Sequence, residues 1–281
     1  MNNFTIFKRN TFGKRKFKNG KIKVALLTNE LPPIVYGGVA TWCVNFINMM
    51  SKNTKIELIP VFLAYNDQLS PSDSIKYDKL RIINSPDEIY DTFKDIDICI
   101  NNLWVALETI IQLKQQLSDI HIITVCHSLI RMEHITNLGS VYTNNFNDQE
   151  KTFEYSDTVV LISKAEETYY KQFGYNKFPA KTHVILNSYI PKHDKKSFEV
   201  NYESNDIGYI GRHVPRKRAE LGVRAVIEQL KNTSVKVFNM GVDYDKYDNE
   251  YWRKMAKKYE EQLTVIPFST DKSKKEKYWQ D

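Results

Sequence analysis

The stretch Ile207-Gly-Tyr-Ile-Gly-Arg-His-Val-Pro-Arg-Lys217 predicts a short buried strand, a glycine turn and two cations at the start of a helix. Apolar residues at 207, 209 and 210 form the strand, and Gly211 permits a sharp turn without a Cβ clash. Arg212 leaves that turn, and Lys217 opens a helix over residues 217–231. Open α/β sheets bind ligands at the carboxyl ends of their strands, which is where this turn lies. A guanidinium and an ammonium group beside a helix N-terminus suit a diphosphate.

The rest of the chain alternates strand-like runs with helical segments, which is typical of a mostly parallel sheet covered by helices. The fold class is therefore α/β. One helix is expected over Val39–Met50, and Ser163 is a suitable N-cap for another that begins at Lys164. The predicted strands before residue 190 are Lys23–Thr28, Ile56–Leu63, Leu80–Ile83, Ile96–Asn101, His121–Cys126, Thr158–Ile162 and His183–Leu186.

Changes in composition divide the chain into a basic leader (1–22), a first Rossmann-like domain (23–190), a linker (191–205) and a second domain (206–281). The linker is polar and rich in lysine. The second domain holds only about half of a Rossmann-type sheet, so we expect a partner or further chain to cover its edge. Its predicted elements are strands 206–210, 234–239 and 263–267, and helices 217–231, 247–261 and 271–279.

Composition is that of a globular protein, since 42% of the 281 residues are hydrophobic and 12% are aromatic. No run approaches the ~18 consecutive apolar residues of a membrane span, and the first residues contain no apolar segment of signal-peptide length, so we do not expect secretion. The three cysteines, Cys43, Cys99 and Cys126, lie among apolar neighbours and form no CxxC pair. We expect them to be reduced, which favours the cytoplasm.

Positive charge is concentrated in the leader. Residues 1–23 contain eight of the 40 Lys and Arg residues and no acid, so the remainder carries 32 basic against 34 acidic side chains. Such a segment binds anionic phospholipid or nucleic acid, or it is simply a solvated, disordered leader. The first interpretation predicts an anionic membrane as a partner, which the leader contacts peripherally.

A glycine pair, Gly37-Gly38, precedes the helix Val39–Met50 and follows Tyr36. Adjacent glycines at a helix start let backbone amides approach a phosphate or a sugar. The alternative is a turn that only permits close helix packing. Both interpretations stay open at this point.

His127 follows the predicted strand His121–Cys126 at its carboxyl end. A histidine there can bond a sugar hydroxyl or transfer a proton near neutral pH, although a lone histidine is more often structural. Arg131 and His134 follow in the same segment and are candidates for an acceptor pocket. No zinc spacing is present, and Asp243-Tyr244-Asp245 is a weak metal candidate in a turn. The sequence has no GxSxG, P-loop or HExxH motif.

Taken in order, these motifs resemble the superfamily of retaining glycosyltransferases with the GT-B fold, which includes glycogen synthase and sucrose synthase. The likeness covers about residues 21–270. It is carried by Glu30-Leu-Pro-Pro-Ile-Val-Tyr-Gly-Gly38, Thr124-Val-Cys-His-Ser128, the segment 150–163 (EKTFEYSDTVVLIS), Val184-Ile-Leu-Asn187, and Gly211-Arg212 with Lys217.

The resemblance implies two Rossmann-like domains that face a cleft, with a nucleotide-sugar donor as substrate. It implies a hexosyltransferase that retains anomeric configuration and needs no metal or other cofactor. By likeness, Arg212 and Lys217 neutralise the diphosphate, Gly37, Gly38 and Gly211 contact the donor, and His127 bonds a sugar hydroxyl.

Two departures from the family pattern stand out. Arg218 occupies the position after Lys217, where the family usually has glycine. The sequence also stops before the family's P-S-x-x-E-x-x-G segment, so we expect the second domain to be incomplete.

Several acceptors and functions fit the sequence. A glycan, a glycolipid or a small molecule would be the acceptor of a bacterial-type enzyme, whereas a viral or phage enzyme of this fold can act on DNA bases, with the leader on phosphate. A second interpretation is a non-catalytic scaffold that assembles with a partner or with its own copies. A GT-B epimerase is the weakest alternative.

Overall fold

A computed structural model describes residues 20–35, 37–64, 76–103, 107–136, 145–187, 206–211, 217–230, 233–239 and 246–266. The chain forms two compact units, which we call unit 1 (residues 1–132 and 142–190) and unit 2 (residues 133–141 and 191–281). Residues 1–19 of the predicted leader, the linker 191–205 and the last predicted helix lie outside the described residues.

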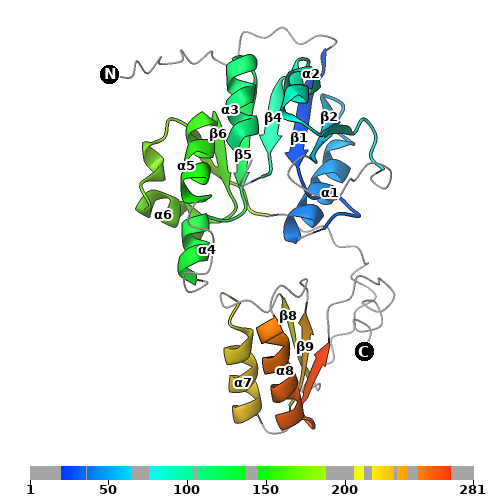
Figure 1. The fold of residues 1–281 in the computed structure, drawn as a ribbon, viewed down its shortest axis with the longest axis vertical. Helices are drawn as coiled ribbons and strands as arrows, with labels where there is room; N and C mark the ends of the chain where they lie inside the picture. Colours follow the sequence, from blue (N-terminus) through cyan, green and yellow to red (C-terminus); the bar gives the residue numbers. More distant parts are fainter. Residues whose placement is uncertain are drawn as a thin grey trace. The chain divides into compact units, whose positions relative to one another are not determined.

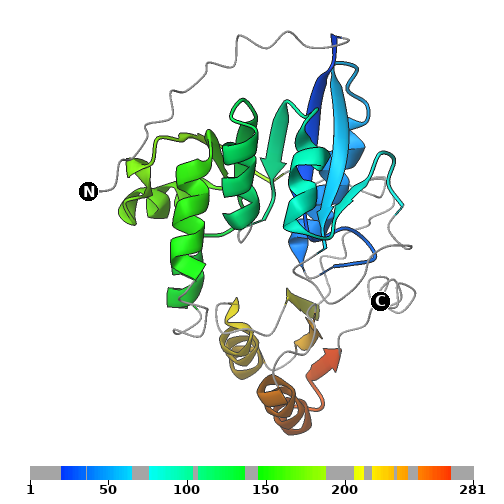
Figure 2. The ribbon, with the colours of Figure 1, turned by 45° about the horizontal axis from the view of Figure 1, so that its top comes forward.

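Unit 1 is built on a seven-stranded parallel sheet in the order β3-β2-β1-β4-β5-β6-β7. The two longest strands, β1 and β2, run side by side (Figure 2), with Ile22 opposite Ile56 and Thr28 opposite Phe62. The strands are β1 (Ile22–Thr28), β2 (Ile56–Leu63), β3 (Arg81–Ile83), β4 (Ile98–Asn101), β5 (His121–Cys126), β6 (Thr158–Leu161) and β7 (Lys181–Val184).

Helices cover the two faces of this sheet (Figure 1) because neighbouring residues of a strand point to opposite sides. Leu26 of β1 packs with Cys43 of α1 on one face, whereas Leu27 packs with Phe93 of α2 and Ile110 of α3 on the other. The helices are α1 (Gly38–Met50), α2 (Ile89–Phe93), α3 (Leu107–Gln116), α4 (Ile130–Thr136), α5 (Asn145–Tyr155) and α6 (Lys164–Gln172), with 3-10 turns η2 (Pro86–Glu88) and η3 (Tyr175–Lys177).

Unit 2 has a three-stranded parallel sheet in the order β10-β9-β8. Its core is formed by apolar side chains of both helices and of the strands, with Val237 and Trp252 2% exposed or less. The elements are β8 (Asp206–Gly211), α7 (Ala219–Gln229), β9 (Ser234–Asn239), α8 (Lys246–Lys258) and β10 (Leu263–Ile266). Within the described ranges of both units, none of the helices combines the length and apolarity that a bilayer crossing requires.

Where they fall on described residues, the predicted strands and helices are confirmed with shifts of a few residues at their ends, and the α/β class is confirmed. β7 is the exception, because it covers Lys181–Val184 where the sequence predicted His183–Leu186. Pairing ends at Leu161, since Ser163 Oγ accepts from Glu166 N at 3.0 Å and starts α6. Ile185 N still donates to Leu161 O at 2.9 Å, but Ile185 and Leu186 lie beyond the last paired residue of β7, Val184, and are 58% and 69% exposed.

Truncation of Leu27 tests the packing of unit 1. Leu27 is fully buried and Leu186 is 69% exposed, so Leu27→Ala should lower the free energy of unfolding by ~2–5 kcal/mol and Leu186→Ala by at most ~0.5 kcal/mol. Urea unfolding followed by circular dichroism measures both. Equal losses in the two variants would contradict the assigned core.

Candidate functional site

The carboxyl ends of three neighbouring strands bring polar side chains to one edge of the unit 1 sheet. Thr28 ends β1, Asn102 follows β4 and His127 follows β5. Asn102 N donates to Leu27 O at 3.0 Å, which extends the ladder one residue beyond β4. Thr28 and Asn102 are at most 2% exposed, so this edge holds an ordered and mostly buried polar group.

His127 is half-buried between two partners. Its Nε2 lies 2.5 Å from Asn102 Oδ1, and its ring meets the indole of Trp42 edge-on with centroids 5.3 Å apart. Burial lowers the pKa of His127 from 6.5 to about 4, because desolvation disfavours the charged imidazolium. At neutral pH the imidazole is uncharged, so it is suited to hydrogen bonding more than to donating a proton as a general acid.

Hydrogen bonds continue from Asn102 into α1. Asn102 Nδ2 donates to Cys43 Sγ at 3.0 Å, and Cys43 Sγ donates to Thr28 Oγ1 at 3.4 Å. Burial raises the pKa of the Cys43 thiol to about 11, so it stays protonated. All three cysteines are buried thiols outside any disulfide, as the sequence predicts.

The glycine pair lies at the N-terminus of α1. Gly37 N donates to Glu30 Oε2 at 2.9 Å, and Gly37 caps the helix without a side-chain hydrogen bond. A Cβ added at Gly37 or Gly38 would meet no heavy atom of the described residues within 4 Å. Within the described residues, close helix packing therefore does not explain these glycines, and the approach of their amides to a ligand stays a prediction. Tyr36 lies outside the described residues.

Arg131 and His134, the predicted acceptor-side residues, both belong to α4. Arg131 Nη2 lies 2.6 Å from Glu150 Oε1 of α5, and its guanidinium stacks over the rings of Phe146 and Tyr175. This ion pair joins α4 to α5. His134 is half-buried one turn further along the helix.

In unit 2, Gly211 ends β8 and Lys217 precedes α7. A Cβ at Gly211 would lie 3.3 Å from the Tyr209 hydroxyl, which itself donates to Lys217 O at 3.2 Å. Tyr209 thus ties the strand end to the helix start, and Lys217 is exposed there. Arg212 lies outside the described residues.

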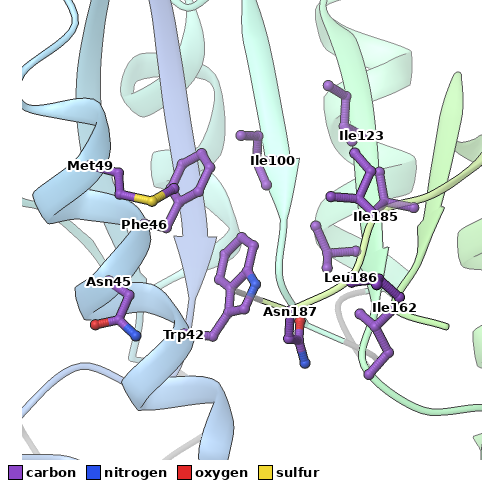
Figure 3. A pocket seen from close by; sticks show the side chains of 12 residues that line it. Trp42, Asn45, Phe46, Met49, Ile100, Ile123, Ile162, Ile185, Leu186 and Asn187 are labelled. Carbon is purple, nitrogen blue, oxygen red and sulfur yellow. The ribbon is translucent and has the colours of Figure 1, made fainter. Parts of the chain in front are cut away.

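An apolar cavity of about 260 Å³ lies on the α1 face of the unit 1 sheet. Figure 3 shows Trp42, Phe46 and Met49 on its α1 side, facing side chains of the strands and of the segment after β7. Trp42 and Phe46 stack at 4.9 Å. The remaining lining residues are Asn45, Ile100, Ile123, Val125, Val160, Ile162, Ile185, Leu186 and Asn187.

No family model matches this sequence, and neither does any curated protein. Solved structures do match. Sucrose-phosphate synthase from Thermosynechococcus elongatus aligns with 89% of this chain and 71% of its own, with a TM-score of 0.66 and 14% identity. The chain has the GT-B fold.

Two further matching structures were solved with bound molecules. Anabaena HepE in complex with UDP and glucose aligns over 89% of this chain and 70% of its own, with a TM-score of 0.59 and 11% identity. An alpha-glucosyltransferase in complex with UDP and a 13-mer DNA aligns over 88% and 67%, with a TM-score of 0.52 and 12% identity.

Sequence reasoning missed three residues that surround His127. Asn102 and Cys43 form its hydrogen-bonded support, and Trp42 packs on its ring. The position of Asn102 directly after a predicted strand was the available signal, because strand ends of a parallel sheet share one edge. Cys43 and Trp42 carried no such signal within an amphipathic helix.

The pKa of His127 predicts a pH dependence of stability. Its folded value, about 4, lies below the value of 6.5 that an exposed histidine has. The unfolded chain then binds more protons between pH 6.5 and 4, so the free energy of unfolding falls as pH falls through this window. Between these limits the unaltered protein should lose about 1–3 kcal/mol more than His127→Gln does. Urea unfolding at several pH values measures this, and parallel curves would contradict it.

Proposed function

We propose that this protein is a glycosyltransferase that moves a sugar from a nucleotide-sugar donor to an acceptor. The proposal rests on the N-terminus of α1, where the backbone of Gly37 and Gly38 lies next to open space. The GT-B likeness over 89% of the chain supports the reaction class, as does the UDP and glucose bound to Anabaena HepE.

The chemistry around the glycine pair favours a sugar over a phosphate in unit 1. Glu30 already accepts from Gly37 N, and a second anion beside this carboxylate would be repelled. Sugar hydroxyls instead donate to carboxylates and to neutral imidazole. In this proposal Gly38 and His127 bind the sugar. The acceptor-side roles of Tyr36, Arg131 and His134 belong to the same proposal.

In unit 2 the proposed role is binding of the diphosphate by Arg212 and Lys217. Lys217 is exposed beside the N-terminus of α7, where a cation and orphan amides together attract an anion. Loss of charge neutralisation as the diphosphate leaves would slow the reaction. Transfer of a hexose with retention, without a metal, is the finer form of this proposal.

The glycine pair gives the direct test. Gly38→Val should fold normally, because the added side chain meets open space, yet it should block the ligand and weaken donor binding about tenfold or more. Gly222→Val on α7 is the matched control, since a Cβ there also meets nothing within 4 Å. Calorimetry with UDP-glucose, UDP-galactose, UDP-N-acetylglucosamine, ADP-glucose and GDP-mannose measures binding. Equal affinity in both variants would exclude the α1 site.

Turnover tests the cations. Arg212→Ala with Lys217→Ala should lower release of free nucleotide by on the order of a thousandfold, as two charge-assisted contacts are lost. Lys257→Ala, on the exposed side of α8, is the control and should leave the rate unchanged. Chromatography of the nucleotide measures the rate. Turnover that survives the double substitution would refute the assignment of Arg212 and Lys217.

We propose a glycan, a glycolipid or a small molecule as acceptor. DNA is the second candidate, because eight Lys and Arg residues lie within residues 1–23 and a structure of similar fold holds DNA. Duplex affinity that falls steeply with salt would favour DNA. Absence of duplex binding at low salt would remove it, and binding to anionic vesicles would then favour a lipid acceptor.

A further inference from the structure

The hydrogen bonds around His127 have a direction that the backbone fixes. Thr28 Oγ1 accepts from Glu30 N at 3.1 Å and donates its only proton to Glu30 O at 3.4 Å. A hydroxyl whose proton is already committed can only accept further bonds. Cys43 Sγ, 3.4 Å away, must therefore be the donor to Thr28.

The same reasoning passes from Cys43 to the asparagine. Once the thiol proton is directed at Thr28, the sulfur can only accept, so the amide group 3.0 Å from it is Nδ2 of Asn102. The amide oxygen of Asn102 then faces Nε2 of His127 at 2.5 Å. An amide oxygen accepts only, which makes Nε2 the protonated nitrogen of the ring.

We propose that Asn102 is a positioning residue that holds His127 as the Nε2–H tautomer, so that Nδ1 accepts a hydrogen bond from a substrate hydroxyl. The last clause depends on the proposed function, and the tautomer does not. No hydrogen bond to Nδ1 is made within the described part of the chain, and the ring is neutral at pH 7.

This assignment gives the site a polarity. Nδ1 of a neutral ring in this tautomer carries a lone pair, so it selects ligands with a hydroxyl and offers nothing to a ligand atom that only accepts. Asn102 is 2% exposed and is held by its backbone bond to Leu27. It acts on the ligand only through His127.

A neighbouring asparagine provides the control. Asn101 is also buried, and its side chain bonds Thr124 Oγ1 at 3.2 Å and Leu103 N at 3.1 Å, away from the imidazole. Asn101→Leu and Asn102→Leu therefore remove similar buried amides, but only Asn102→Leu removes the acceptor for Nε2–H. Asn102→Asp keeps an acceptor oxygen at that place.

Nitrogen NMR of the imidazole of His127, on the full chain without ligand, decides the tautomer. We expect the Nε2–H form with a hydrogen-bonded ring proton in the unaltered protein, in Asn101→Leu and in Asn102→Asp. Asn102→Leu should give a mixture of tautomers and lose that proton signal. An Nδ1–H form in the unaltered protein, or unchanged spectra in Asn102→Leu, would overturn the proposal.

Kinetics with UDP-glucose as donor test the consequence for the ligand. Asn102→Leu should lower kcat/KM about tenfold, the effect of one hydrogen bond, while Asn101→Leu leaves it within twofold at equal folded fraction. Equal losses in both variants would refute positioning by Asn102. If no nucleotide sugar is turned over by the unaltered protein, the proposed function fails, and the spectra still decide the tautomer.

Discussion

Parallel pairing of β1 with β4 is the interaction on which the candidate site depends. The register sets Leu27 opposite Asn101, and the next bond, from Asn102 N to Leu27 O, carries the pairing past the end of β4. Asn102 is thereby fixed between Cys43 and His127. A slip of one residue would turn each side chain to the opposite face and would separate all three.

The support of the site is made of neutral groups. Within the described residues, a hydroxyl, a protonated thiol, an amide and an uncharged imidazole follow one another from Thr28 to His127. Charged groups at such depth would need partners to offset desolvation, whereas these groups satisfy one another. Their arrangement tolerates changes of pH near neutrality, because none of them changes its charge there.

Much of the fold follows from the sequence, because strand and helix periods are local signals. The bounds of β2, β5 and β9 agree with prediction, and His127 was found because it directly follows a strand. The bounds of β7 were not predicted correctly, since they depend on where β6 stops pairing. Pairing of Arg131 with Glu150, 19 residues away, was equally hidden, because only the packed fold brings α4 beside α5.

Trp42 has two neighbours that no sequence pattern connects. The residue lines the apolar cavity, and its ring also contacts the ring of His127 edge-on, with centroids 5.3 Å apart. Phe46 lies parallel to the indole within 7°, so the indole cannot tilt without losing that stack. A molecule in the cavity would therefore contact the same indole that packs on the imidazole. The indole is also a fluorophore, so light emission from this one side chain reports on both places at once.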